Sequence, residues 1–558
     1  MDFAGSIKTA LKKELNVEAV LEVPHSAELG DFAFPCFFLA KTMKKSPVEI
    51  AKWLEARIKV DGVRVRADGA YLNFFVDNES FSEKILKEAF SAGFGCRKKS
   101  GRKVVVEFPG PNTNKPLHLG HVRNICLGHS FCLLGEANGD IMIPVNINND
   151  RGVHICKSML AYQKWGVGDS PEKSGVKSDF FVGKYYVMFS KAAADNPELE
   201  NEALAMLKKW ESGDKVVIAL WKKMNKWALD GFKKTYKSFG IKFVKEYYES
   251  RTYKAGKKLV LEGLKKNIFR RNEKGAVVFG MGDGAEKVLL REDGTSVYIT
   301  QDMYLAKLRY DDFKFDKLVY VVATEQNFHF RVLFEVLKAL GFPFAEKCRH
   351  FAYGMVNLTT GRMKSREGTV VDADTLVADI EKLAFSETKA RHPELSDKKV
   401  SERARVIAMG AVRFYILKND PVKDMLFDSK QSISLEGGTG PYVQYAHARC
   451  CSILRKYGKK ISDNVDFGLL SNSAEISLVK LLGEFPVVVE RSYSMYRQSL
   501  LANYLLSLAQ EFSNFYSQCQ VVSEDECLTR VRALVVDCTR NVLSRGLGLL
   551  GIESPEEM

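Results

Sequence analysis

One feature constrains the fold of this sequence most: a short β-branched run that ends in a carboxylate and leads through a Pro- and Asn-rich loop into a helix. The run is VVVE (Val104–Glu107), the loop is FPGPNTNKPL, and the helix begins at HLGH (His118–His121). Open α/β sheets build nucleotide sites from such a strand, loop and helix. The helix N-terminus presents unpaired N–H groups and the positive end of its dipole to a phosphate. The segment therefore predicts a nucleotide site.

Four residues make ATP the expected nucleotide. His118 and His121 are three residues apart, so in a helix they share a face beside the anion site. Gly120 leaves room for a flat group such as adenine to lie against the backbone. Lys115 precedes the first histidine by three residues and can reach a triphosphate. HLGH alone recurs by chance, and the alternative interpretation is a pair of surface histidines. The flanking strand and loop favour the nucleotide site.

Composition narrows the class of protein. A chain of 558 residues is expected to form about three or four domains. Its longest apolar runs, such as Phe32–Ala40, are far shorter than the ~20 residues that span a bilayer. No apolar leader is visible, so we expect a cytoplasmic protein that does not enter a membrane. The 11 cysteines include no CxxC pair, which predicts neither a disulfide framework nor a structural zinc site. A net charge of +14 favours a polyanionic partner.

Four regions follow one another along the chain. Amphipathic helical patterns alternate with short strand-like runs in residues 1–98, and a doubly wound pattern of apolar strands and helices fills residues 99–380. A lysine-rich stretch at about 165–215 is interpreted as an insertion in that pattern. Helical patterns then form a connecting region at 381–431 and dominate 432–558. The predicted fold is α/β: a doubly wound parallel, Rossmann-like sheet, a small α+β N-terminal domain and an all-α C-terminal domain.

Two further segments carry polar side chains that fit a binding pocket. SVYITQDMYLAKLRY places Tyr298 four residues before Asp302, and the apolar strand of LVYVVATEQNFHF runs into Gln326. Ligands of open α/β sheets bind beyond the carboxyl ends of the strands, where Glu107 and Asn112 are also expected. Each residue alone has an ordinary alternative, such as a helix cap or a solvated side chain. As a set they predict an acidic pocket inside a basic protein.

The residues around HLGH resemble a known family. HLGH is similar to the first signature of class I aminoacyl-tRNA synthetases, and the longer string EFPGPNTNKPLHLGHVRN resembles the arginine-specific family among them. The resemblance implies that the amino acid is bound by five residues: Glu107, Asn112, Tyr298, Asp302 and Gln326. Their chemistry fits, because a guanidinium presents five donors in a planar fork that carboxylate and amide oxygens can accept.

The second signature of these synthetases is expected in RMKSR (Arg362–Arg366). The motif departs from the family pattern, because Ser365 stands where the second lysine belongs. Members of the family that lack this lysine often carry a lysine just before the first signature instead, and Lys115 is at that position here. The resemblance therefore implies a catalytic set of Lys115, His118, His121, Lys364 and Arg366, and ATP contacts from His118, Gly120, His121, Met363 and Lys364. The alternative for RMKSR is a solvated basic loop.

The outer regions resemble the tRNA-binding domains of the same family. YLNFFV, near the end of the N-terminal region, implies tRNA contacts from Asn73 and Phe75. PYVQYAHAR and the C-terminal segment resemble the helical anticodon-binding domain. They imply contacts from Tyr442, Gln444, Tyr445, His447, Arg449 and Met558. Aromatic and basic side chains can stack on unpaired bases. A stripe at helical spacing also occurs in cores, so some of these residues are expected only to pack.

The resemblance implies an arginine–tRNA ligase. Such an enzyme activates arginine with ATP to arginyl-adenylate and transfers it to the 3′-terminal adenosine of tRNA(Arg). Mg²⁺ is expected to travel with ATP, no structural zinc is expected, and the chain is expected to be a monomer. Three alternatives stay open: another class I synthetase such as the cysteine-specific one, a catalytically inactive synthetase-like RNA-binding protein, and a small-molecule nucleotidylyltransferase. The last would not need the helical C-terminal region.

Overall fold

The computed structural model describes residues 3–24, 26, 29–282, 284–358, 372–434 and 437–558. Their contacts divide the chain into two compact units. The larger unit comprises Gly95–Ala448, Pro486–Ser507 and Leu543–Met558, and the smaller comprises Met1–Phe94, Arg449–Phe485 and Leu508–Val542.

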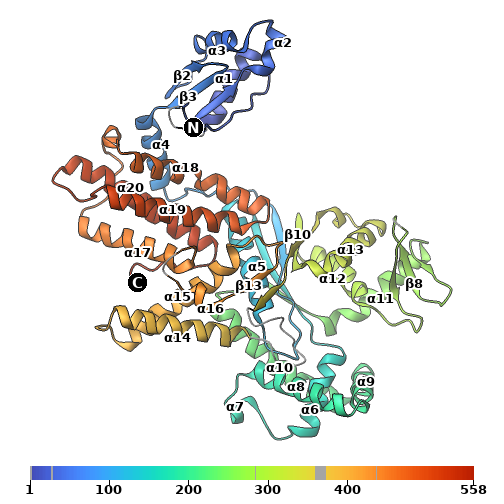
Figure 1. Cartoon of the computed structure of the whole chain (residues 1–558). Helices are drawn as coiled ribbons and strands as arrows, with labels where there is room; N and C mark the ends of the chain where they lie inside the picture. The colour runs from blue at the N-terminus through green and yellow to red at the C-terminus, as the bar shows by residue number, and fades with distance from the viewer. Residues whose placement is uncertain (1–2, 25, 27–28, 283, 359–371, 435–436) are drawn as a thin grey trace. The chain divides into compact units, whose positions relative to one another are not determined.

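A five-stranded sheet forms the centre of the larger unit (Figure 1). All its pairings are parallel, in the order β11-β10-β4-β5-β6. The strands are β4 (Lys103–Glu107), β5 (Ile141–Asn148), β6 (Lys245–Tyr248), β10 (Lys317–Ala323) and β11 (Cys348–Tyr353). β4 comes first in the chain and lies in the middle, so the strand order reverses between β4 and β10. Such a reversal opens a crevice at the carboxyl ends of the strands, where open sheets bind ligands.

Helices connect and cover these strands. They are α5 (Leu119–Ala137), α6 (Val153–Trp165), α11 (Glu249–Lys265), α12 (Tyr298–Phe313) and α13 (Asn327–Ala339). α5 is buried on almost every side. Its Gly128 packs directly on the Phe108 ring, where a Cβ would overlap the ring atoms. Arg123 on α5 is fully buried and donates hydrogen bonds to the carbonyl groups of Met355, Pro421 and Lys423. α5 therefore packs against the loop at the end of β4 and is also hydrogen-bonded to the segments around Met355 and Pro421.

A helical segment separates β5 from β6. After α6 it contains α7 (Pro171–Ser174), α8 (Ser178–Asp195), α9 (Glu198–Glu211) and α10 (Lys215–Ser238). Residues 165–215, interpreted from sequence as an insertion, lie within it, and the helical structure continues through α10. Figure 1 shows these helices side by side.

Smaller elements complete the larger unit. An antiparallel sheet of β7 (Arg270–Arg271), β8 (Val277–Gly280) and β9 (Glu286–Leu290) precedes α12. β12 (Val356–Leu358) pairs in parallel with β13 (Met425–Phe427). Between them lie α14 (Ala373–Arg391) and α15 (Asp397–Leu417), and α16 (Ser429–Ser432) follows. Short 3-10 helices occur at η3 (Thr324–Gln326) and η4 (Ala345–Lys347).

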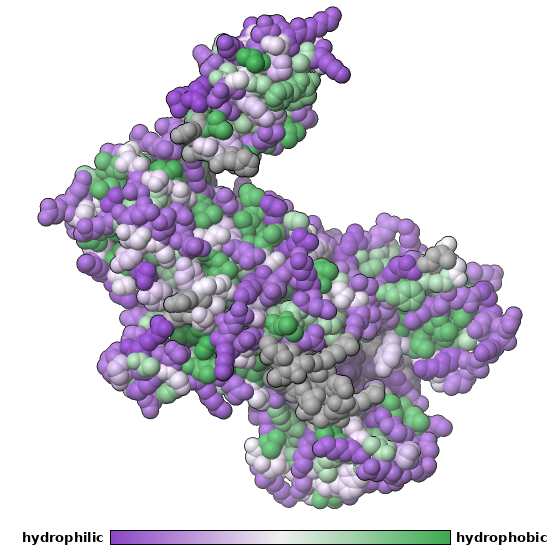
Figure 2. Space-filling model, viewed as in Figure 1, coloured by the Kyte–Doolittle hydropathy of each residue, from purple (hydrophilic) through white to green (hydrophobic). Residues whose placement is uncertain are grey.

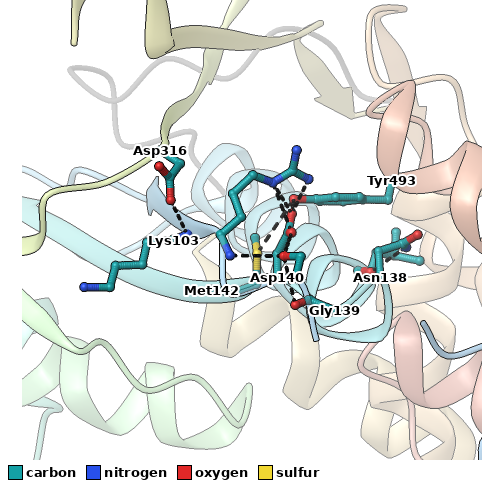
Figure 3. A network of polar contacts seen from close by, with 10 residues as sticks. Lys103, Asn138, Gly139, Asp140, Met142, Asp316 and Tyr493 are labelled. Atoms are coloured by element: carbon teal, nitrogen blue, oxygen red, sulfur yellow. Dashed lines mark hydrogen bonds and ion pairs between the residues drawn. The ribbon is translucent and has the colours of Figure 1, made fainter. Parts of the chain in front are cut away.

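A buried carboxylate fastens the amino ends of the strands (Figure 3). Asp140, just before β5, accepts hydrogen bonds from Ser100 (2.8 Å), the Tyr493 hydroxyl (2.6 Å) and the Arg102 guanidinium. Burial alone would raise the pKa of Asp140, but these hydrogen bonds outweigh burial and lower it. The Lys103 N–H donates to Asp316 at 2.9 Å, which aligns β4 with β10. This edge lies opposite the carboxyl ends.

The smaller unit contains the N-terminal domain. Its antiparallel sheet has the order β1-β3-β2, from β1 (Phe32–Pro35), β2 (Val63–Asp68) and β3 (Tyr71–Val76). Its helices are α1 (Phe3–Leu15), η2 (Phe37–Leu39), α2 (Ala40–Met43), α3 (Pro47–Glu55) and α4 (Asn78–Phe90). α3 begins with a capping box, in which Ser46 and Glu49 each accept a hydrogen bond from the other's backbone N–H. The small α+β domain predicted from sequence is thus present.

The C-terminal region is helical, as predicted. It contains α17 (Gly440–Tyr457), η5 (Phe467–Leu469), α18 (Ser473–Ser494), α19 (Gln498–Gln518) and α20 (Glu526–Leu549), and the four α-helices contribute residues to both units. In the described part of the chain, no helix combines the length and the apolar content that crossing a bilayer requires.

The contact between α5 and Phe108 can be tested by substitution. Gly128→Ala should lower the free energy of unfolding by about 1–3 kcal/mol, because an added methyl overpacks this position. Gly548→Ala on α20 is the matched control. Nothing lies within 4 Å of a Cβ there, so alanine should be neutral or stabilising by about 0.5–1 kcal/mol. Urea unfolding followed by tryptophan fluorescence measures both, and equal midpoints would contradict the packing described.

Candidate active site

The two histidines of HLGH form the first turn of α5. His118 is the N-cap, and its Nδ1 accepts the Gly120 N–H at 3.2 Å. The Nδ1 of His121 accepts the His118 N–H at 3.1 Å, and the ring centroids are 3.9 Å apart. Burial, reinforced by the Lys115 charge, lowers the pKa of His118 to about 3. Burial also lowers the pKa of His121, together with the charges of His118 and Lys115. Both rings are therefore neutral at pH 7, with the proton on Nε2, and each offers one donor to an anion.

The loop before HLGH is fixed along the end of β5. The Asn149 N–H donates a hydrogen bond to the Pro111 carbonyl at 2.9 Å, and the Thr113 N–H donates one to the Asn149 carbonyl at 3.1 Å. The Gly110 N–H donates to the Asn146 side chain at 3.1 Å. These bonds hold the backbone on both sides of Asn112, whose side chain is exposed. The strand, loop and helix predicted from sequence are present.

Three predicted residues of the second signature, Met363, Lys364 and Arg366, lie outside the described residues. The chain is described again from Asp372, which forms a β-bridge with His118. The next N–H, that of Ala373, donates to the Leu117 carbonyl at 2.9 Å. The start of α14 is thus bonded to the start of α5.

Two of the five predicted pocket residues line one cavity of about 640 Å³. Asn112 and Tyr298 face it together with Gln301, which follows on α12. Tyr298 is 71% exposed and also borders a second cavity of about 330 Å³, which Gln326 and His329 line. Asn112 and Gln326 thus line different cavities that share Tyr298, whereas Glu107 and Asp302 line neither of the two.

Asp302 and Glu107 have partners within the fold. Asp302 Oδ2 lies 2.7 Å from His329 Nε2, and the Asp302 side chain is 34% exposed. Glu107, at the end of β4, forms an ion pair with the fully buried Arg309 of α12. The Arg309 guanidinium therefore balances the charge of Glu107. The sequence did not indicate this partner.

Glu249 is a buried carboxylate that the sequence prediction missed. It follows β6 directly and lines the larger cavity with Asn112 and Tyr298. Burial raises the pKa of Glu249 to about 7, against the opposing effects of Arg151 and of a hydrogen bond from Gln301. KEYYES lacks the β-branched apolar run that precedes Glu107, and its only signal is a carboxylate that follows a short strand with two tyrosines.

Arg151 is the second missed residue of this cavity. Its guanidinium pairs with Glu211 at the end of α9 and lies 3.8 Å from Glu249. It also lies 3.9 Å from the centroid of the Tyr253 ring. Arg151 thus joins the helical segment between β5 and β6 to the cavity wall.

The predicted tRNA contacts of α17 separate into interior and exposed side chains. Gln444 is fully buried and donates to the Glu553 carbonyl at 2.8 Å, and His447 Nδ1 lies 2.9 Å from the Pro555 carbonyl. Both side chains hold the C-terminal segment, because buried polar groups need partners. Tyr445 is 39% exposed, and Tyr442 and Arg449 are partly exposed. The Arg449 guanidinium lies 5.2 Å from the centroid of the exposed Tyr516 ring.

The remaining predicted contacts differ in the same way. Asn73 is buried within β3, whereas Phe75 is partly exposed. The guanidinium groups of Arg64 and Arg66 lie 4.6 and 4.9 Å from the centroid of the Phe75 ring. Figure 2 shows hydrophobic residues among hydrophilic ones on the visible face of the N-terminal domain, which contains Asn73 and Phe75. Met558 packs with the hydrophobic cluster around Ala404, between α14 and α15.

Family models match three parts of the chain. Residues 84–429 match the catalytic domain of class I (R) tRNA synthetases, 2–76 match the arginyl tRNA synthetase N-terminal domain, and 443–558 match the DALR anticodon binding domain. The catalytic model alone spans more than half of the chain. The chain belongs to the arginyl-tRNA synthetase family.

Relatives of this arginyl-tRNA synthetase family member match it over its whole length. The arginine–tRNA ligase of Treponema denticola is 46% identical, over 98% of this chain and 95% of that protein. The arginine–tRNA ligase of Treponema pallidum is 41% identical, over 97% and 95%. The structure of the Thermus thermophilus arginyl-tRNA synthetase superposes with a TM-score of 0.82 at 26% identity, covering 100% of this chain and 99% of that one. These matches confirm the predicted family and fold class.

Proposed function

We propose that this chain is an arginine–tRNA ligase, which activates arginine with ATP and transfers it to the 3′-terminal adenosine of tRNA(Arg). One observation carries the proposal. In a chain that matches arginine–tRNA ligases over nearly its whole length, a cavity at the carboxyl ends of β4, β5 and β6 is lined by Asn112, Arg151 and the buried carboxylate of Glu249. The lining is not acidic as a whole, because the carboxylates of Glu211, Glu249 and Asp293 lie among five cations: Arg151, Lys208, Lys254, Lys257 and Arg291. The carboxylates suit a cationic amino acid and the cations suit a polyanionic partner.

The acidic side chains hold the arginine. Asp302 and Glu249 accept the guanidinium hydrogens, and Tyr298 and Gln326 border it. Asn112 and Glu107 lie towards the α-amino group. Arginine displaces His329 from Asp302 when it binds, so that the carboxylate exchanges one donor for two. A substrate bound by paired polar groups is selected strongly, because an analogue without the guanidinium leaves buried acceptors unpaired.

Adenylate formation is an in-line displacement. A carboxylate oxygen of arginine forms a bond to the α-phosphorus of ATP while the bond to the pyrophosphate oxygen breaks. Lys115 and the Nε2–H groups of His118 and His121 stabilise the charge on the phosphates, and Gly120 lies against the adenine. Met363, Lys364 and Arg366 approach ATP from the RMKSR segment. Mg²⁺ enters with ATP and neutralises phosphate charge. In the second step the terminal ribose hydroxyl of tRNA attacks the arginyl carbonyl, and AMP leaves.

The exposed aromatic and basic side chains contact tRNA. Tyr445 and Arg449 of α17 face the anticodon, and Phe75 with Arg64 and Arg66 offers a ring between cations to the RNA. Gln444 and His447 act through packing, because their side chains are occupied by the C-terminal segment. We further infer a monomer that works in the cytoplasm.

Charging assays with total tRNA and each of the 20 standard amino acids test the activity. Arginine alone should be attached. Charging of another amino acid would show that the chain is a synthetase of a different amino-acid specificity. Binding of tRNA without any charging would favour the inactive RNA-binding alternative.

Loss of the Asp302 carboxylate should weaken arginine selectively. Asp302→Ala should raise the arginine KM by the equivalent of about 2–5 kcal/mol, as expected when one partner of a hydrogen-bonded charge pair is lost. The ATP KM should stay within about twofold. The matched control is Asp311→Ala on the same helix, where an exposed carboxylate pairs with Lys307. Wild-type arginine KM in Asp302→Ala would show that the pocket is assigned wrongly.

Lys115 should matter for the rate rather than for affinity. Lys115→Ala should lower kcat of arginine- and tRNA-dependent ATP–pyrophosphate exchange by ~10², the order expected for one preorganised charge at the transition state. Lys184→Ala, which removes an exposed lysine from α8, should leave kcat unchanged. An unaltered kcat in Lys115→Ala would assign the pyrophosphate contact to the cations of RMKSR instead.

The raised pKa of Glu249 predicts a pH dependence. Only the ionised carboxylate attracts a guanidinium, and with a pKa of about 7 it is mostly protonated at pH 6 and mostly ionised at pH 8. The value of kcat/KM for arginine should therefore rise about tenfold from pH 6 to pH 8. Glu249→Gln should remove this rise together with much of the affinity, whereas Glu262→Gln, exposed on the same helix, should keep it. A flat wild-type profile would contradict this role.

A further inference from the structure

The helical segment between β5 and β6 packs directly on the residues before HLGH. Gly183 of α8 lies so close to them that a Cβ there would come 2.6 Å from Pro116 Cδ and 3.6 Å from Lys115 Cα. The main chain of α8 is therefore a wall for the segment that carries Lys115. A shift of α8 would move that segment.

Lys177, at the N-cap of α8, binds side chains of two other helices. Its Nζ donates to Asp374 of α14 at 2.6 Å and to Thr235 of α10 at 2.6 Å. It also donates to Asp179 of α8 at 3.1 Å. The Lys177 side chain is only 20% exposed, so solvent competes little for these contacts. One ammonium group thus joins α8, α10 and the first turn of α14.

The first turn of α14 is in turn bonded to the start of HLGH. The Ala373 N–H donates to the Leu117 carbonyl at 2.9 Å, and Asp372 forms a β-bridge with His118. Asp374, the partner of Lys177, follows directly. α8 therefore borders the segment at Lys115 and Pro116, and α14 borders it at Leu117 and His118. Lys177 connects these two supports.

We propose that Lys177 is a positioning residue for adenylate formation, which ties α8 to α14 so that Lys115 and His118 are held in place between them. The inference rests on the proposed function. Lys177 contacts neither ATP nor arginine in this scheme. It acts through the two main-chain supports of the catalytic segment, where a displacement of about 1 Å can cost ~10² in rate.

The charges around Lys177 make it hard to replace. Asp179 is fully buried, and its Oδ1 has no hydrogen-bond partner among the described residues. Burial raises the pKa of Asp179 to about 6, an effect that Lys177 opposes and Asp374 reinforces. Without the ammonium, two carboxylates would face each other at close range and repel, so α14 would move away from α8.

The test uses the full-length enzyme with tRNA(Arg) present in every assay. Lys177→Met should lower kcat of ATP–pyrophosphate exchange by about 10- to 100-fold and leave the arginine KM within about twofold. Lys164→Met is the matched control, because Lys164 also pairs with a carboxylate of this helical segment, Glu202, at 2.8 Å. It should keep wild-type kcat.

A double-mutant cycle separates positioning from general stability. If Lys177 acts through Lys115 and its neighbours, adding Lys177→Met to Lys115→Ala should lower kcat by much less than it does in the wild type. Equal effects in both backgrounds would overturn the inference, as would a wild-type kcat in Lys177→Met. Should Lys177→Met not fold, Asp374→Asn removes the partner charge at the same volume. A reduced kcat at unchanged arginine KM supports the inference, and a wild-type kcat overturns it.

The two proposals fail in different ways. A wild-type chain that does not charge arginine would overturn the proposed function and this inference with it. A wild-type chain that charges arginine, with Lys177→Met equally fast, would overturn the inference alone.

Discussion

The reversal of strand order beside β4 is the constraint on which the rest of the structure depends. β5 and β6 lie on one side of β4, and β10 and β11 lie on the other. Connections leaving β4 and β10 therefore diverge at their carboxyl ends. The loop that leaves β4 runs along the end of β5, where Pro111 and Thr113 are bonded to Asn149, and then enters α5. The N-terminus of α5, with His118 as its N-cap, therefore lies at the edge of the sheet where open sheets bind ligands. The Asp140 network secures the opposite edge, so the carboxyl ends are free for chemistry.

Buried and partly buried charge pairs join the connections to one another and, at Glu107, to this sheet. Arg309 meets Glu107, Arg151 meets Glu211 and Glu249, and Lys177 meets Asp179 and Asp374. Such pairs contribute little net stability, because desolvation offsets most of the attraction between the charges. Removing one partner costs much more, since the other charge stays buried alone. Their main effect is geometric: the pair at Glu107 fixes α12 against β4, and the other two fix helices of the connections against one another.

Charge acts at two ranges in the proposed activity. The net charge of +14 attracts polyanions such as RNA over a long range. The larger cavity is lined by both signs of charge, with Glu249 buried in its wall and Asp302 close enough to raise the pKa of Glu249. A free arginine is a cation that the net charge disfavours, so under the proposed function its selection depends on these two carboxylates.

The sequence by itself determined what depends on near neighbours in the chain. The strand, loop and helix around HLGH, the apolar strand before Gln326 and the helical C-terminal region are all present as predicted. In each case periodicity and short-range hydrogen bonding decide the local structure. The family was also predictable, because its motifs are contiguous strings.

Only the tertiary structure decided which side chains meet. Lys177 and Asp374 are 197 residues apart in the chain, Arg309 and Glu107 are 202 apart, and no local pattern indicates such pairings. The same holds for Gln444 and His447: on sequence they belong to one stripe with Tyr445, but the C-terminal segment covers them. Burial, and with it the pKa of Glu249, depends on everything packed around a residue. That is a property of the folded chain and not of any short stretch of its sequence.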